Sequence, residues 1–163
     1  MIRVLIADES PRITENIVKR ESDLVVCGTA KDGEYAVQEA LRLQPDVAII
    51  DAGLPGMDGV QTTEMLAQYL PRTGVIMMSM EAENEAYRHA MLAGAREFLQ
   101  KPFKGDDMVA AIRRVHAFEQ RKAVPEAAKV ETTTTTTGPT EGTGQVITVF
   151  AIVITIALSR LVG

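Results

Sequence analysis

The sequence is poor in the residues that build cross-linked or zinc-stabilised folds. It contains one cysteine, Cys27, and two histidines among 163 residues. A single cysteine cannot form an intramolecular disulfide, and no set of Cys and His residues has the spacing of zinc ligands. A disulfide-rich secreted domain and a zinc finger are therefore excluded.

Basic residues are also in the minority, with 17 Lys and Arg against 22 Asp and Glu and a net charge of −5. This excess of acidic residues argues against a protein that binds nucleic acid over its whole surface. The opening residues MIRVLIADES lack a long apolar run that ends in small residues, so we expect no cleaved secretory signal. The motifs GxxxxGK[ST], HExxH and GxSxG are missing, which excludes three common kinds of nucleotide and hydrolytic site.

The composition divides the chain into three regions, which suits one domain with additional segments. Residues 1–121 have ordinary globular composition and hold the entire charge of −5. Residues 122–145 contain eight threonines and only five apolar residues in 24, which predicts a disordered, flexible linker. Residues 146–163 form an apolar tail with 13 hydrophobic residues in 18 and a single charge.

Short apolar runs alternate with amphipathic stretches through the first region. The expected strands are Ile2–Ala7, Leu24–Gly28, Val47–Ile50, Val75–Ser79 and Glu97–Leu99. The expected helices are Pro11–Arg20, Gly33–Leu43, Gly59–Tyr69, Glu83–Leu92 and Gly105–Phe118, with Ser10 and Asp58 as N-caps of the first and third. This alternation predicts an α/β fold with a five-stranded parallel sheet and right-handed crossovers.

Polar side chains collect where the expected strands end, and in such sheets the functional crevice lies beyond the carboxyl ends of the strands. Asp8 and Glu9 follow the first strand, Asp51 the third, Ser79 ends the fourth, and Lys101 follows the fifth. Neighbouring carboxylates repel one another and need a cation, and Mg²⁺ suits hard oxygen ligands with phosphate as a co-ligand. These residue types predict a Mg²⁺-dependent acyl-phosphate site.

Residues 1–121 resemble the receiver domain of two-component response regulators. The matching sequences are Asp8-Glu9, Ile50-Asp51, Leu54-Pro55-Gly56-Met57-Asp58-Gly59, Ser79, Gly94-Ala95 and Lys101-Pro102-Phe103. The resemblance implies a doubly wound, flavodoxin-like fold with strand order 2-1-3-4-5. It also implies a cis bond between Lys101 and Pro102. After residue 121 there is no pattern for a helix-turn-helix, so we expect no direct contact with nucleic acid.

The same resemblance assigns roles to individual residues. It implies Asp51 as phosphoacceptor, Asp8 and Glu9 as Mg²⁺-coordinating acids together with Asp51, and the backbone carbonyl of Gly53 as a further ligand. It implies that Lys101 pairs with the phosphoryl group.

Ser79 and Phe98 match the switch residues of the family, and Ser79 is placed to hydrogen-bond a phosphoryl oxygen. Two positions depart from the usual pattern. Glu9 stands where a second Asp is more frequent but keeps the carboxylate. Met80 stands where a small residue is usual, and we expect its bulk to slow phosphoryl access.

The resemblance implies a phosphorylation-controlled signalling protein of the cytoplasm, with Mg²⁺ as cofactor. A sensor histidine kinase or phosphotransfer protein would phosphorylate Asp51, and the face of helix 4, strand 5 and helix 5 would then change its binding to a downstream protein or to a second copy. Any catalysis is limited to self-phosphorylation from a phosphodonor and autodephosphorylation. The alternative function is a non-catalytic interaction or localisation module of a pilus or secretion assembly protein.

The apolar tail leaves two interpretations open. Val146–Val162 reaches the low end of the ~17–25 residues that a helix needs to span a bilayer, so the tail is either an anchor at the inner face of the membrane or a truncated strand. The second interpretation starts from residues 144–150 (GQVITVF), which resemble the opening strand of ParA/MinD-type ATPases. Pilus-assembly proteins join such an ATPase to a receiver-like domain, but the phosphate loop that should follow is absent here, as after a truncation or frameshift.

Overall fold

The computed structural model describes residues 1–81 and 84–123. Strands and helices alternate along this part of the chain, as the sequence predicted. The strands are β1 (Ile2–Ala7), β2 (Leu24–Ala30), β3 (Val47–Asp51), β4 (Gly74–Ser79) and β5 (Glu97–Gln100). The helices are α1 (Arg12–Lys19), α2 (Gly33–Leu43), α3 (Gly59–Tyr69), α4 (Asn84–Ala93) and α5 (Gly105–Ala123).

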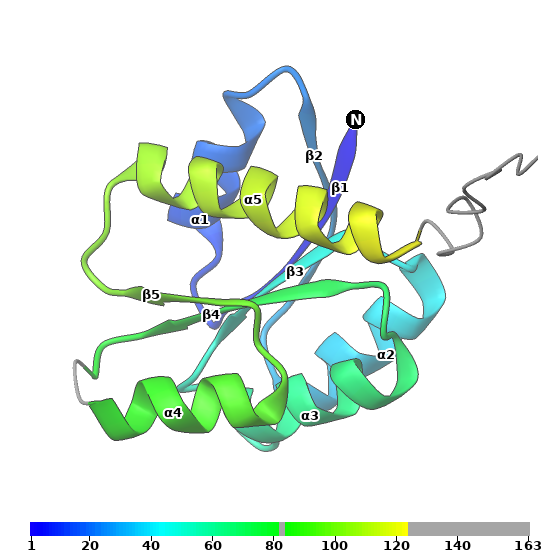
Figure 1. Ribbon diagram of the computed structural model, residues 1–163. Coiled ribbons are helices and arrows are strands. Elements are labelled where there is room, and N and C mark those ends of the chain that lie inside the picture. Colours follow the sequence, from blue (N-terminus) through cyan, green and yellow to red (C-terminus); the bar gives the residue numbers. More distant parts are fainter. Residues whose placement is uncertain (82–83, 124–163) are drawn as a thin grey trace, which may run out of the picture. The chain divides into compact units, whose positions relative to one another are not determined.

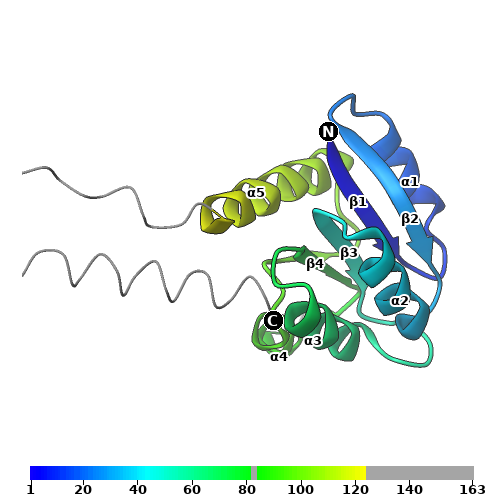
Figure 2. The ribbon, with the colours of Figure 1, turned by 90° about the vertical axis from the view of Figure 1, so that its right-hand side faces the viewer.

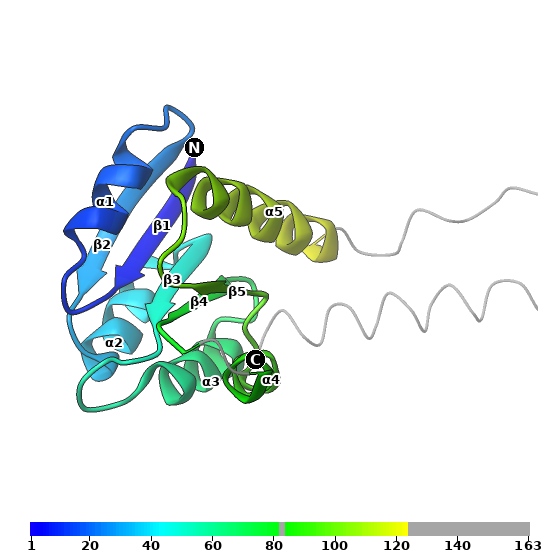
Figure 3. The same cartoon turned by 90° about the vertical axis from the view of Figure 1, so that its left-hand side faces the viewer.

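The five strands form one parallel sheet in the order β2-β1-β3-β4-β5, which confirms the predicted topology. Helices α1 and α5 cover one face of the sheet and α2, α3 and α4 cover the other (Figure 1). Because every strand is parallel, all five carboxyl ends lie at one edge, and Figure 3 shows the strand arrows pointing the same way. This doubly wound arrangement brings residues from distant parts of the sequence to that edge.

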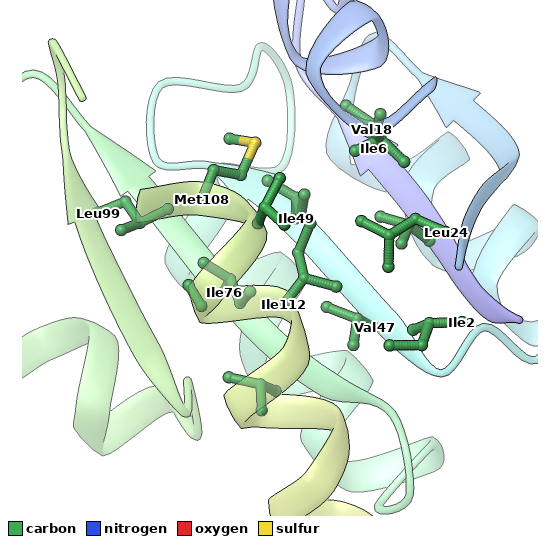
Figure 4. Packing of buried hydrophobic residues seen from close by; sticks show 14 of the residues in the cluster. Ile2, Ile6, Val18, Leu24, Val47, Ile49, Ile76, Leu99, Met108 and Ile112 are labelled. Carbon is green, nitrogen blue, oxygen red and sulfur yellow. The ribbon is translucent and has the colours of Figure 1, made fainter. Parts of the chain in front are cut away.

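Two large apolar clusters and a smaller one around Met77 and Ala90 fill the spaces between the sheet and its helices. The cluster under α1 and α5 includes Ile6, Ile49, Ile76 and Ile112, which are all fully buried (Figure 4). The opposite cluster packs α2 and α3 against the other face of β1, β3 and β4. The central strands β3 and β4 are buried along almost their whole length, as expected for strands that helices cover on both sides.

The structure corrects the predicted start of the first helix. Ser10 does not cap α1: the N-cap is Pro11, with helical backbone angles and no side-chain cap hydrogen bond. The Pro11 carbonyl already accepts the first helical hydrogen bond, from the Glu15 N–H at 2.8 Å. The backbone N–H of Ser10 instead donates to the Asp8 carboxylate at 2.8 Å.

Several element boundaries also differ from the prediction. β2 continues to Ala30, and α5 continues as one unbroken helix to Ala123 (Figure 2). The α5 helix therefore includes the first two residues of the predicted linker. The rest of the linker and the apolar tail lie outside the described residues. Within residues 1–81 and 84–123, no helix is long and apolar enough to cross a membrane.

Candidate functional site

The sheet register brings the predicted site residues to one edge. Ser79 at the end of β4 pairs with Gln100 at the end of β5, and Asp51 at the end of β3 pairs with Met78. The Lys101 N–H donates to the Ser79 carbonyl at 2.7 Å, so the lysine leaves β5 beside the serine. The predicted cis bond between Lys101 and Pro102 is present.

Lys101 joins two carboxylates at this edge. Its Nζ contacts Asp51 Oδ2 and lies 3.6 Å from Asp8 Oδ2. The three side chains are mostly withdrawn from solvent, with exposed fractions of 22% for Lys101, 20% for Asp51 and 11% for Asp8. One ammonium therefore interacts with two carboxylates in a partly buried place, where solvent screens charges less than at the surface.

Backbone N–H groups hold the other oxygen of each carboxylate. Asp8 Oδ1 accepts from the N–H of Ser10 at 2.8 Å, and Asp51 Oδ1 accepts from the N–H of Gly53 at 3.0 Å. Each bond closes a short turn directly after a strand, where Asp commonly hydrogen-bonds the backbone two residues on. The carboxylates are thus oriented by the local chain before any ligand is present.

A hollow of about 300 Å³ opens beside Asp51 and reaches Ser79, Phe98 and His89. Ser79 is buried and its hydroxyl accepts from the Glu81 N–H at 3.0 Å. The remaining lining residues come from β4, α4, the start of α3 with its cap, and the loops after β3 and β4: Ala52, Gly53, Asp58, Val60, Met77, Met80, Glu81 and Ala86. The hollow is lined by both polar and apolar side chains, and it is large enough for a phosphoryl group.

Three predicted positions differ in how they meet this site. Glu9 directly follows the buried Asp8 in the chain and is exposed. Phe98 is partly buried, and its ring meets Tyr87 edge-on at 6.0 Å between centroids. Met80 lines the hollow with its side chain 74% exposed. Its bulk therefore stands at the mouth of the hollow.

His89 is a residue of this site that the sequence pattern did not predict. His89 lies in α4 one turn after Ala86, and both residues line the hollow. The spacing of three residues along a helix puts them on one face, but the sequence does not show which face of α4 meets the site. His89 also approaches Glu85, with 3.9 Å between Nε2 and the carboxylate.

The oxygen atoms at the sheet edge fit Mg²⁺ in their chemistry. Asp8 and Asp51 supply hard carboxylate oxygens that converge on the Lys101 ammonium, so a cation at this edge would have both as ligands. In residues 1–81 and 84–123, no three Asp, Glu, His or Cys side chains are already arranged as a metal cluster. Lys101 provides the positive charge between the two carboxylates in this structure.

The chain matches a known family over most of its described length. Residues 4–113 match the family described as the response regulator receiver domain. The chain is 38% identical over 108 residues to protein-glutamate methylesterase/protein-glutamine glutaminase 1 of Syntrophus aciditrophicus, which covers 63% of this chain and 31% of that protein. It is 33% identical over 119 residues to the response regulator protein VraR of Staphylococcus saprophyticus, covering 71% of this chain and 56% of that protein. The chain thus spans about a third to a half of the curated relatives that it matches.

Solved structures agree with this match. The response regulator domain of Thermotoga maritima CheB superposes with a TM-score of 0.67 at 29% identity, covering 72% of this chain and 97% of that one. The signal receiver domain of the putative response regulator NarL from Mycobacterium tuberculosis gives 0.67 at 31% identity, covering 71% and 96%. In both cases almost the whole of the other domain is matched by part of this chain.

Proposed function

Since this chain belongs to the response regulator receiver domain family, we propose that it is a signalling switch whose phosphoacceptor is Asp51. The single observation that supports this most directly is the position of the Asp51 carboxylate. It ends a central strand, contacts the Lys101 ammonium and borders a hollow that fits a phosphoryl group. A phosphorylated histidine of a sensor kinase or phosphotransfer protein is the proposed donor.

The transfer is a displacement at phosphorus. A carboxylate oxygen of Asp51 forms a bond to the phosphorus, the bond from phosphorus to the donor nitrogen breaks, and the leaving imidazole takes up a proton. Lys101 stabilises the negative charge of the transferring group, because its ammonium already contacts the acceptor carboxylate. The N–H of Gly53 keeps the other carboxylate oxygen in place.

Asp8 and Asp51, together with Glu9 and the Gly53 carbonyl, are the proposed Mg²⁺ ligands. When bound, Mg²⁺ would neutralise charge on the phosphoryl oxygens. Asp8 is held by the N–H of Ser10, so its carboxylate is positioned without a metal. The Lys101 ammonium lies between Asp8 and Asp51, so it is placed to pair with a phosphoryl group on the acceptor carboxylate.

The response to phosphorylation is proposed to run through Ser79 and Phe98. Both residues line the hollow beside Asp51, and the Ser79 hydroxyl holds the N–H of Glu81 in the loop that leads to α4. The O–H of Ser79 would donate to a phosphoryl oxygen, draw the serine toward Asp51 and favour a second arrangement of the loop and of Phe98. The face of α4, β5 and α5 would then bind its downstream protein with a different affinity.

The proposal is tested by treating the protein with acetyl phosphate and Mg²⁺ and measuring its intact mass. We expect one phosphoryl group on the wild type, none on Asp51→Asn, and an unchanged adduct on Asp106→Asn, which alters an exposed acid at the start of α5. If a chelator removes Mg²⁺ before acetyl phosphate is added, no adduct should form. A wild type that binds Mg²⁺ but gains no phosphoryl group would instead support the non-catalytic interaction module.

A further inference from the structure

A second hollow lies at the opposite end of β5 from Lys101. It has a volume of about 330 Å³ and lies between the start of β5 and the second half of α5. Its lining residues are Arg96, Glu97, Arg114, Val115, Phe118 and Arg121. The phosphoacceptor site uses none of these residues.

An aromatic side chain stands among cations in this hollow. Phe118 is 47% exposed, although a large apolar side chain on a helix usually turns toward the core. The Lys122 ammonium lies 4.7 Å and the Arg96 guanidinium 5.7 Å from the centroid of the Phe118 ring. These cation–π contacts hold the ring in a defined place on the surface and keep it available to a ligand.

The surroundings of the ring are positively charged, although residues 1–121 carry −5 in total. Arg96 is bound to the buried Glu119, with 2.6 Å from Nε to Oε1, and Arg114 is bound to Glu97. Arg121 donates to the Ala117 carbonyl at 3.3 Å. A carbonyl is uncharged, so this hydrogen bond does not neutralise the guanidinium.

Counting Lys122, the hollow and its edge hold four cations and two carboxylates. Cations in the last turn of a helix also stabilise the negative end of its dipole. That effect explains Arg121 and Lys122, but not Arg96 directly before β5 or Arg114 two turns earlier in α5. The excess of positive charge therefore lies on the surface between β5 and α5.

We propose that this hollow binds an acidic peptide segment of a partner protein. An apolar side chain of the segment would rest on Phe118 and Val115, and flanking carboxylates would pair with Arg121 and Arg114. A concave site with an apolar floor and a basic rim fits one protruding side chain, which favours a peptide over a flat anionic membrane. This proposal rests on the proposed function in one respect: it takes the face of α4, β5 and α5 as the surface that binds the downstream protein, and it says that this protein offers an acidic segment.

The test uses short fluorescent peptides in which acidic residues flank one aromatic residue, each paired with a peptide whose acids are replaced by amides. We expect binding of the acidic peptides alone, measured by fluorescence anisotropy, and a loss of affinity at high salt. Phe118→Ala and Arg121→Glu should each weaken binding by about tenfold or more. Both positions are exposed, so folded variants are expected, and circular dichroism checks this.

The matched control is Arg20→Glu, which reverses an exposed arginine at the end of α1 and should leave the affinity unchanged. Equal binding by wild type and Arg121→Glu would overturn the proposal, as would equal binding of the amide peptides. Binding to phosphatidylserine vesicles but not to peptides would overturn it in favour of a membrane. A dimer that Arg121→Glu dissociates, with no peptide binding, would assign the surface to a second copy.

The two proposals fail in different ways when the assay is repeated with acetyl phosphate and Mg²⁺. A phosphoryl group on Asp51 without peptide binding in either state would overturn the peptide site and leave the phosphoacceptor intact. Peptide binding by a chain that gains no phosphoryl group would support the peptide site and overturn the phosphoacceptor.

Discussion

Cys27 shows how a single residue is shaped by its position at the edge of the sheet. Along β2, Val26 pairs with Val4 and Gly28 pairs with Leu5, so Cys27 is the extra residue of an irregularity in the ladder. Its side chain is partly buried against the cluster under α2. Burial raises the pKa of the Cys27 thiol, because the thiolate loses hydration there.

We therefore expect Cys27 to be alkylated slowly by iodoacetamide in the folded protein. The thiolate is the nucleophile, so a raised pKa moves the rise of the reaction rate to higher pH than for a free cysteine. The rate is followed by intact mass across a series of pH values, and the absence of other cysteines makes each adduct unambiguous. The same protein in concentrated urea should show the ordinary profile, and identical profiles in both states would contradict the prediction.

At the scale of single site residues, the sequence was informative where a residue directly follows a strand. Asp8, Asp51 and Lys101 meet because parallel strands end at one edge, and this follows from the order of the elements alone. His89 was not found because its place depends on how α4 is rotated over β5. Phe118 was not found because nothing in the helical pattern of α5 shows which apolar residue remains exposed.

At the scale of helices and strands, the N-terminal ends of the helices show which capping residues fix where a helix begins. Asp58 caps α3 as predicted: its backbone is extended, and its carboxylate accepts from the Gln61 N–H at 2.8 Å. Asp32 caps α2 in the same way through the N–H of Tyr35. Ser10 fails as a cap because Pro11 is already helical and follows it directly. A capping residue therefore predicts a helix start only when the next residue is the first helical one.

We expect Asp58→Ala to lower the free energy of unfolding by about 1 kcal/mol, since the substitution leaves an N–H at the start of α3 without its partner. Asp58→Asn should cost much less, because the amide oxygen still accepts from the N–H of Gln61. Urea unfolding followed by circular dichroism measures both values. Equal losses for the two variants would show that the charge near the helix N-terminus, and not the capping bond, provides the stability.

For the molecule as a whole, composition and periodicity were sufficient for the architecture. Five apolar runs separated by amphipathic stretches have few arrangements that bury both kinds of segment, and right-handed crossovers reduce these further. The strand order came from the resemblance to receiver domains, and pattern alone could not supply it. Element ends were less predictable, since α5 continues to Ala123 through residues whose composition resembles the linker that follows.

The core beneath α5 should dominate the stability of the domain. Ile112 is fully buried between α5 and the sheet, so Ile112→Ala removes apolar contacts and leaves a cavity (Figure 4). We expect a loss of about 2–5 kcal/mol in the free energy of unfolding. Ile13→Ala is the control, because Ile13 in α1 is 75% exposed and its truncation should cost less than about 0.5 kcal/mol. Similar losses in urea unfolding for both variants would contradict this assignment of the core.

Arg113 ties α5 to the turn between α1 and β2, about ninety positions earlier in the chain. Its guanidinium donates to both oxygens of Asp23, at 2.8 and 2.9 Å, and to Glu21 at 2.8 Å. The hydrogen bonds from Arg113 hold the pKa of Asp23 below its ordinary value of 3.8 and raise the pKa of the arginine. A carboxyl group whose pKa is lowered by folding stabilises the folded state above the unfolded pKa, and this contribution is lost as the pH falls through the folded value.

We therefore expect Arg113→Ala to lower the urea midpoint at neutral pH and the difference from wild type to shrink as the pH falls below about 4. The pair is exposed, so high salt should also reduce the difference at neutral pH. Arg121→Ala is the matched control, because Arg121 donates to a backbone carbonyl whose charge does not change with pH. If the Arg113→Ala difference stayed constant from pH 7 to about pH 3, packing of the arginine stem, and not its charge, would connect the two elements.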